Sequence, residues 1–105
     1  MSTFKFGKAG KPVEKLIVDT IIRHIKPKQI ILFGSRARDD APARSDYDVA
    51  IDDDELTPAK LARIRAEMEI VPTLLSIDVI WMNRAAETLR KRIVNEGKIL
   101  YERQG

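Results

Sequence analysis

The 105-residue chain has no cysteine and only one histidine, so two residue types that often bind metals are nearly absent. Without cysteine, neither a disulfide framework nor a thiolate metal site can form. The single histidine, His24, stands near the expected end of a helix, and we interpret it as a solvated or capping side chain. We therefore expect no histidine–cysteine metal cluster.

The chain also lacks long apolar segments and the common glycine-rich nucleotide motifs. It has no apolar run of about twenty residues, and residues 1–11 are basic without the apolar stretch of a signal peptide. We therefore expect a cytoplasmic protein without a membrane contact. Neither Gly-x-x-x-x-Gly-Lys-Ser/Thr nor Gly-x-Gly-x-x-Gly is present, which excludes a P-loop.

The composition indicates one small globular domain. A chain of 105 residues has room for a single core, and 44% hydrophobic residues argue against disorder. We expect residues 1–11 to form a flexible basic arm and residues 12–105 to form the domain. The lysines of the arm offer a nucleic-acid contact as an alternative, which we rank below a solvated terminus.

Hydrophobic periodicity predicts alternating helices and strands. The first helix should end before Pro27, with Glu14 on its polar face. A second helix is expected over residues 58–71, and a third should be capped by Asn83 and ended by Gly97. Alternating apolar and polar residues, or short apolar runs, predict strands over residues 30–33, 46–52, 74–81 and 98–101. The pattern predicts an α/β (α+β) sandwich, with helices packed against one small sheet of about four strands.

A glycine–serine pair follows the first expected strand. Glycine lets the backbone approach a phosphate closely, and a helix that begins at Ser35 would direct its free N–H groups toward that phosphate. Arg36 and Arg38 come next, and a guanidinium group can pair with triphosphate oxygens. The alternative for Gly34-Ser35 is an ordinary helix start followed by two surface arginines.

Two aspartates stand two positions apart in the second expected strand. The side chains of Asp46 and Asp48 therefore leave from one face, with about 7 Å between their Cα atoms. Such a pair repels unless a cation lies between the carboxylates, and Mg²⁺ prefers these oxygen ligands. Asp78, inside the third apolar run, would join them if its strand is adjacent. A solvated edge strand that happens to carry acids is the alternative interpretation.

One geometric condition must hold if Ser35 and Asp46 contact the same ligand. Ser35 follows the end of one strand, whereas Asp46 precedes the start of the next. The two strands must then run antiparallel, and the sheet must be mixed.

Together these motifs resemble the minimal nucleotidyltransferases of the DNA polymerase β-like superfamily. That family has Gly-Ser, ten residues and then Asp-x-Asp, and here Gly34-Ser35 is followed by residues 36–45 and Asp46-Tyr47-Asp48. A third family carboxylate on a later strand matches Asp78. The resemblance extends from about residue 13 to residue 101.

The resemblance implies a nucleotidyltransferase fold and Mg²⁺-dependent transfer of AMP from ATP. Family members of this small type are often encoded beside a HEPN-domain partner, and several act as antitoxins that adenylylate a tyrosine of that toxin. The resemblance therefore implies a HEPN-domain partner and protein adenylylation. The implied residues are Gly34, Ser35 and Arg36 for the nucleotide, and Asp46, Asp48 and Asp78 for catalysis and two Mg²⁺ ions.

Two alternatives to protein adenylylation stay open, one with a different acceptor and one without catalysis. The first is nucleotidyl transfer to a small molecule or to an RNA end. The absence of an acceptor-binding accessory domain within these residues argues against it. The second is a non-catalytic antitoxin that neutralises its partner by binding alone, and the presence of all three carboxylates argues against that.

Overall fold

A four-stranded mixed sheet forms the centre of the molecule. The computed structural model describes residues 12–34, 37, 46–73 and 76–104, so the expected arm at residues 1–11 lies outside the described part. The strands are β1 Gln29–Phe33, β2 Tyr47–Asp52, β3 Ile77–Trp81 and β4 Lys98–Glu102, in the spatial order β3-β2-β1-β4. β1 is antiparallel to β2 and to β4, whereas β2 is parallel to β3. The expectation of a mixed sheet is confirmed.

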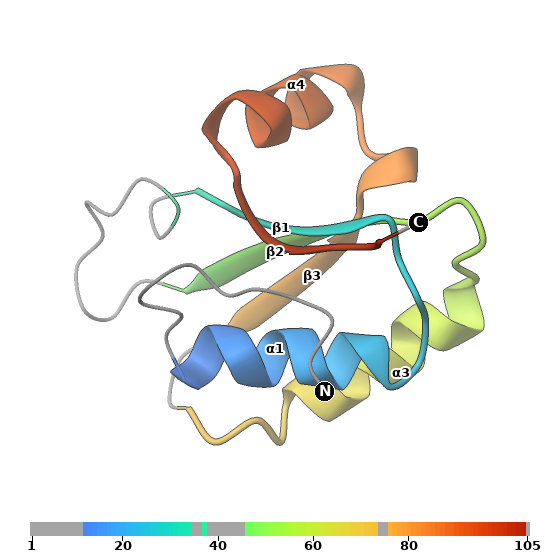
Figure 1. The fold of residues 1–105 in the computed structure, drawn as a ribbon, viewed down its shortest axis with the longest axis vertical. Coiled ribbons are helices and arrows are strands. Elements are labelled where there is room, and N and C mark those ends of the chain that lie inside the picture. The colour runs from blue at the N-terminus through green and yellow to red at the C-terminus, as the bar shows by residue number, and fades with distance from the viewer. Residues whose placement is uncertain (1–11, 35–36, 38–45, 74–75, 105) are drawn as a thin grey trace.

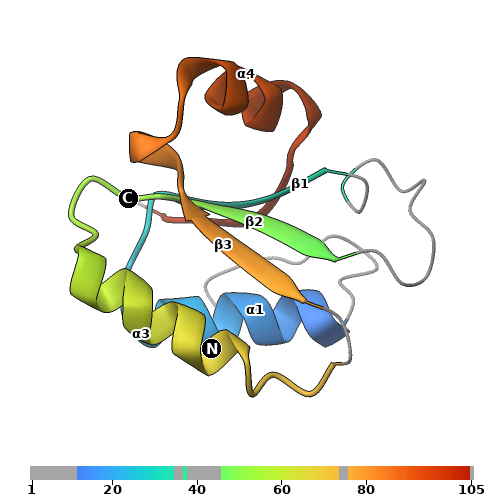
Figure 2. The ribbon, with the colours of Figure 1, turned by 180° about the vertical axis from the view of Figure 1, so that it is seen from behind.

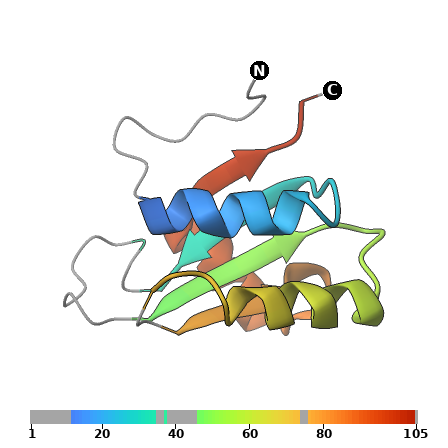
Figure 3. The same ribbon diagram turned by 90° about the horizontal axis from the view of Figure 1, so that it is seen from below.

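Helices cover both faces of this sheet, which gives the predicted sandwich. α1 (Pro12–Ile22) and α3 (Pro58–Met68) lie side by side on one face, as Figures 1 and 3 show. The short 3₁₀ helix η1 (Met82–Arg84) leads into α4 (Glu87–Glu96), which lies on the other face. No helix in the described part of the chain has both the length and the apolar character needed to cross a membrane.

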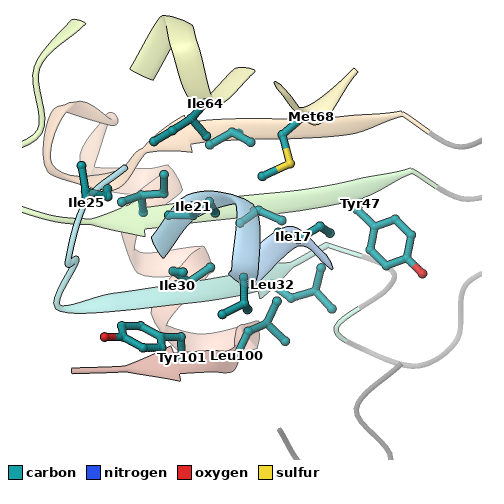
Figure 4. Packing of buried hydrophobic residues seen from close by; sticks show 14 of the residues in the cluster. Ile17, Ile21, Ile25, Ile30, Leu32, Tyr47, Ile64, Met68, Leu100 and Tyr101 are labelled. Atoms are coloured by element: carbon teal, nitrogen blue, oxygen red, sulfur yellow. The ribbon is translucent and has the colours of Figure 1, made fainter. Parts of the chain in front are cut away.

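The larger core lies between the sheet and the helices α1 and α3 (Figure 4). Successive side chains of a strand point to opposite faces, so Tyr47, Val49 and Ile51 of β2 enter this core. A smaller core beneath α4 contains Ile31, Phe33, Ala50 and Ile93. The same alternation leaves Asp48 on the α4 face of the sheet, together with Ala50.

α1 departs from the sequence-based expectation in its length and in one polar residue. It ends at Ile22 rather than continuing to Pro27, because the chain already turns at residues 23–24 to reach β1. The placement of Glu14 on the polar face was wrong, since Glu14 is 3% exposed. Its carboxylate lies 3.4 Å from Lys98 Nζ on β4, a long-range partner that helical periodicity cannot reveal. His24 Nε2 lies 3.0 Å from the carboxylate of Glu67.

Asn83 does not cap α4 as predicted, whereas Gly97 ends α4 as predicted but without the left-handed backbone that glycine often supplies there. α4 has Ala86 at its N-cap, with no side-chain hydrogen bond, and Asn83 instead accepts a hydrogen bond of 2.9 Å from the Asp53 N–H. Gly97 follows α4 as expected, but its φ of −73° is accessible to any residue. A Cβ there would collide with Ile93 O and Ile31 Cγ2. Close packing, rather than a left-handed turn, therefore requires the glycine.

Candidate active site

The end of β1 and the starts of β2 and β3 meet at one end of the sheet. Phe33, the last residue of β1, lies opposite Asp48 in the antiparallel register. Asp48 in turn lies beside Asp78 in the parallel register between β2 and β3. Neighbouring strands are about 4.8 Å apart. The carboxylates of Asp48 and Asp78 are therefore neighbours, and strand alternation places both on the α4 side of the sheet. The expectation that the third strand lies next to the second is confirmed.

Gly34 closes this end of β1 with a left-handed backbone conformation. Its φ is +77°, a region that glycine enters without steric cost. A Cβ on Gly34 would lie 2.7 Å from Asp48 Oδ2, so the backbone approaches the carboxylate in a way that only glycine permits. Ala37 N–H then donates a 3.1 Å hydrogen bond to the Gly34 carbonyl, which makes a tight turn. Ser35, Arg36 and Arg38 lie outside the described residues, so their roles stay predictions.

The three aspartates at this end have different surroundings. Asp46 is exposed and accepts a 3.3 Å hydrogen bond from the Ser76 N–H, just before β3 begins. Asp48 is half-buried, whereas Asp78 is exposed. Burial raises the pKa of Asp48, and the negative charges of Asp78 and Asp46 raise it further. The ionised form of Asp48 is therefore disfavoured until a positive charge reaches it.

The donor set at this end consists of carboxylate oxygens, which suit a hard cation such as Mg²⁺. Asp48 and Asp78 are the pair that the strand register brings together. Over the residues that the structure describes, no group of three acidic or imidazole side chains has the arrangement of a ready metal site. Asp46 lies at the same end of the sheet, where its Oδ1 is engaged by the Ser76 N–H.

Arg92 is a charged residue near this end that the sequence did not single out. It precedes the buried Ile93 of α4, which packs in one cluster with Phe33, the register partner of Asp48. Its positive charge partly offsets the rise in the pKa of Asp48. Arg92 Nε also lies 3.5 Å from Glu96 Oε2. In the sequence, Arg92 and Glu96 are an ordinary i,i+4 pair of a solvated helix. Only the placement of α4 brings the charge of Arg92 close enough to affect Asp48.

Arg65 ties β3, the strand that carries Asp78, to α3. β3 is an edge strand, as Figure 2 shows from behind. Arg65 donates hydrogen bonds from Nε and Nη2 to the Val79 carbonyl, at 3.0 and 2.8 Å. Val79 directly follows Asp78, so this contact restrains the edge strand next to the carboxylate.

Arg65→Ala is expected to lower the free energy of unfolding by about 1–2 kcal/mol, because a carbonyl on an edge strand loses two donors. Chemical denaturation measures the change. Arg63→Ala is the matched control, since Arg63 is exposed on the same helix, and it should change stability by less than about 0.5 kcal/mol. Equal stabilities of the two variants would contradict a restraining role for Arg65.

A cavity of about 320 Å³ opens next to Asp78, between the end of α3 and the start of β3. It combines apolar side chains with hydroxyl and carboxylate groups. Its lining residues are Met68, Glu69, Val71, Thr73, Ser76, Ile77 and Asp78. Met68, Val71 and Ile77 belong to the larger core, so the cavity lies on the α3 side of β3, whereas Asp48 faces α4.

Comparison with known proteins relates this geometry to one family. The family model described as "Polymerase beta, Nucleotidyltransferase" matches residues 15–105. The chain is 28% identical over 88 residues to the protein adenylyltransferase MntA of Aphanizomenon flos-aquae, a match that covers 74% of this chain. The chain spans 59% of the length of that relative.

Solved structures have the same fold. A toxin–antitoxin structure with AMP-PNP has a TM-score of 0.73 and 25% identity, covering 87% of this chain and 74% of that chain. A complex of the tri-AMPylated Shewanella oneidensis HEPN toxin with its MNT antitoxin has a TM-score of 0.67 and 23% identity, covering 88% of this chain and 71% of that one. At 23% identity the second likeness shows the fold alone.

Proposed function

This chain belongs to the polymerase β-like nucleotidyltransferase family, and we propose that it transfers AMP from ATP to a hydroxyl group of a partner protein. One observation carries the proposal. The Gly34 turn lies against Asp48, and the parallel register places Asp48 beside Asp78. A phosphate-binding turn and paired carboxylates at one end of a sheet suit a nucleotide and its metal.

We infer a HEPN-domain toxin as the partner, with this chain acting as its antitoxin. The similarity to a protein adenylyltransferase supports protein adenylylation as the reaction. The structural likeness to a toxin–antitoxin structure with AMP-PNP supports ATP as the donor. Nucleotidyl transfer to a small molecule or to an RNA end has no comparable support.

The proposed roles divide the residues into two groups. Gly34, Ser35 and Arg36 bind the triphosphate, whereas Asp46, Asp48 and Asp78 hold Mg²⁺. When bound, Mg²⁺ stabilises negative charge on the attacking and leaving oxygens. The raised pKa of Asp48 fits this role, because burial and then the negative charges of Asp78 and Asp46 disfavour the ionised carboxylate unless a cation binds beside it.

The bond changes follow from these positions. Asp78 accepts the proton of the acceptor hydroxyl. The hydroxyl oxygen attacks the α-phosphorus in line, a new oxygen–phosphorus bond forms, and the bond to the departing pyrophosphate breaks. The N–H groups of the turn after β1 orient the phosphates during this exchange.

The test is label transfer from ATP labelled at the α-phosphate to a purified HEPN-domain protein in the presence of Mg²⁺. We expect label on the partner with the unsubstituted chain and with Asp52→Asn, a control at the opposite end of β2. We expect none with Asp46→Asn. If the unsubstituted chain transfers no label, but Asp46→Asn still neutralises the toxin, then the chain is a binding module rather than an enzyme.

A further inference from the structure

A groove of about 410 Å³ opens at the edge strand β3, between α3 and α4. α3 contributes Leu61 and Arg65 to its lining, β3 contributes Ile80 and Trp81, and α4 contributes Leu89. Ile80 packs against the smaller core and Trp81 against the larger one, so the groove includes side chains from both faces of the sheet. Figure 2 shows β3 in orange, with the two helices on either side of it.

Ile80 relates this groove to the candidate active site. It stands two positions after Asp78 in β3, so both side chains leave from one face, with about 7 Å between their Cα atoms. This is the α4 face, on which Asp48 lies beside Asp78 in the strand register. A protein segment that fills the groove is therefore two strand positions away from Asp78, on the same face of the sheet.

The groove combines apolar side chains with two positive charges. Arg65 and Arg84 are exposed, and no aspartate or glutamate is among the described lining residues. Neither arginine forms an ion pair with another residue of the described ranges. The hydrogen bonds that Arg65 donates to the Val79 carbonyl leave its charge uncompensated. The groove therefore suits an acidic ligand with apolar groups.

Trp81 is held in place by contacts within the chain. Its Nε1–H donates a 3.0 Å hydrogen bond to the Asp53 carbonyl, and the guanidinium carbon of Arg84 lies 4.4 Å from the ring centroid. An aromatic ring that is already ordered loses little entropy on binding, and tryptophan and arginine are enriched in protein interfaces. Apart from the two arginines, every described lining residue is apolar. This lining favours a protein segment over a nucleic acid, whose interfaces are more polar.

Resting on the partner named in the proposed function, we propose that this groove is the docking site of the protein that receives AMP. Its occupant is a partner segment in which a bulky apolar side chain stands beside a glutamate or an aspartate. The apolar side chain packs against Leu61, Ile80 and Leu89, and the carboxylate pairs with Arg84. Docking there supplies affinity in addition to the contacts of the acceptor hydroxyl at Asp78.

The matched variants Ala85→Glu and Ala86→Glu test this docking site with a purified HEPN-domain protein as the probe. Ala85 lines the groove, whereas its exposed neighbour Ala86 is not among the described lining residues. Ala85→Glu should raise the Kd and the KM for the HEPN-domain protein at least about tenfold, because the new carboxylate fills the groove and repels the acidic segment. The kcat at saturating partner should not change. Ala86→Glu should alter none of these values.

Arg84→Glu tests the contribution of charge. It should also raise the Kd for the HEPN-domain protein at low salt, and the difference from the unsubstituted chain should shrink as salt is added. Arg63→Glu is its control, since Arg63 is exposed on α3 but is not a described lining residue of the groove. All of these variants should bind AMP-PNP as the unsubstituted chain does, which excludes a folding defect.

Direct binding separates failure of this inference from failure of the proposed function. If the chain binds the HEPN-domain protein through the groove but transfers no label, the transferase proposal fails and the docking site stands. If it transfers label and Ala85→Glu keeps the original Kd and KM, the docking site is overturned. Absence of both binding and transfer would overturn both proposals.

Two other occupants of the groove would also overturn the docking site. The first is a second copy of the chain, which sedimentation would reveal if Ala85→Glu dissociates a dimer without changing the affinity for the HEPN-domain protein. The second is a nucleic acid, which would be indicated if Ala85→Glu weakens the binding of a labelled RNA oligonucleotide but not that of the protein.

Discussion

Asp48→Asn is expected to abolish nucleotidyl transfer and, at the same time, to raise the melting temperature. Loss of a metal-binding carboxylate removes several kcal/mol of transition-state stabilisation, so activity should fall by at least about a thousandfold. The stability effect has the opposite sign. Because the pKa of Asp48 is raised in the folded chain, the ionised carboxylate destabilises the folded state at neutral pH. Asparagine keeps the shape and removes the charge.

The dependence of this effect on pH follows from the direction of the pKa shift. The folded chain holds the Asp48 proton more tightly than the unfolded chain does, so this group's contribution to stability falls as pH rises through the raised pKa. The stability advantage of Asp48→Asn should therefore be absent below about pH 4 and fully developed at neutral pH.

Thermal melts across this pH range, with and without Mg²⁺, measure the effect. A ligand that binds the folded state stabilises it, so Mg²⁺ should raise the melting temperature of the unsubstituted chain more than that of Asp48→Asn. Asp52→Asn is the control and should retain the response to Mg²⁺. A less stable Asp48→Asn variant with intact transfer activity would contradict the assigned role of Asp48.

Gly34→Ala is expected to impair both stability and activity. The φ of +77° costs an L-residue about 1–2 kcal/mol. The added Cβ would also lie 2.7 Å from Asp48 Oδ2, so the carboxylate must move. A displacement of about 1 Å in a reacting group can reduce the rate about a hundredfold. Denaturation and single-turnover label transfer measure the two effects.

Gly97→Ala separates these effects, because its Cβ would also be crowded but would contact no aspartate. Its Cβ would meet Ile93 O and Ile31 Cγ2, so the variant should lose stability at least as strongly as Gly34→Ala. Under conditions where both variants are folded, Gly97→Ala should retain its rate per folded molecule. Equal rate losses in both variants would mean that the Gly34 substitution acts through general destabilisation.

Local patterns were sufficient to predict most of the architecture. Period-two alternation in residues 46–52 predicted which face of β2 would carry acids, since a strand has no other way to arrange successive side chains. Helical periodicity located α1, α3 and α4, although their ends were less accurate. The predictions for Glu14, Asn83 and Gly97 were incomplete or wrong because each has a partner distant in sequence: Lys98, Asp53 and Ile31 respectively.

By itself, the sequence determined the candidate chemistry: a glycine–serine turn, two aspartates at alternate strand positions and a third in a later apolar run. These features depend only on the spacing of residues along the chain, which can be read without knowledge of the fold. Only the tertiary structure decided that Asp48 and Asp78 are register neighbours and that the Gly34 backbone lies against Asp48. The physical reason is that strand order, register and helix placement depend on how separate segments bury their apolar faces together, and no local pattern specifies those contacts.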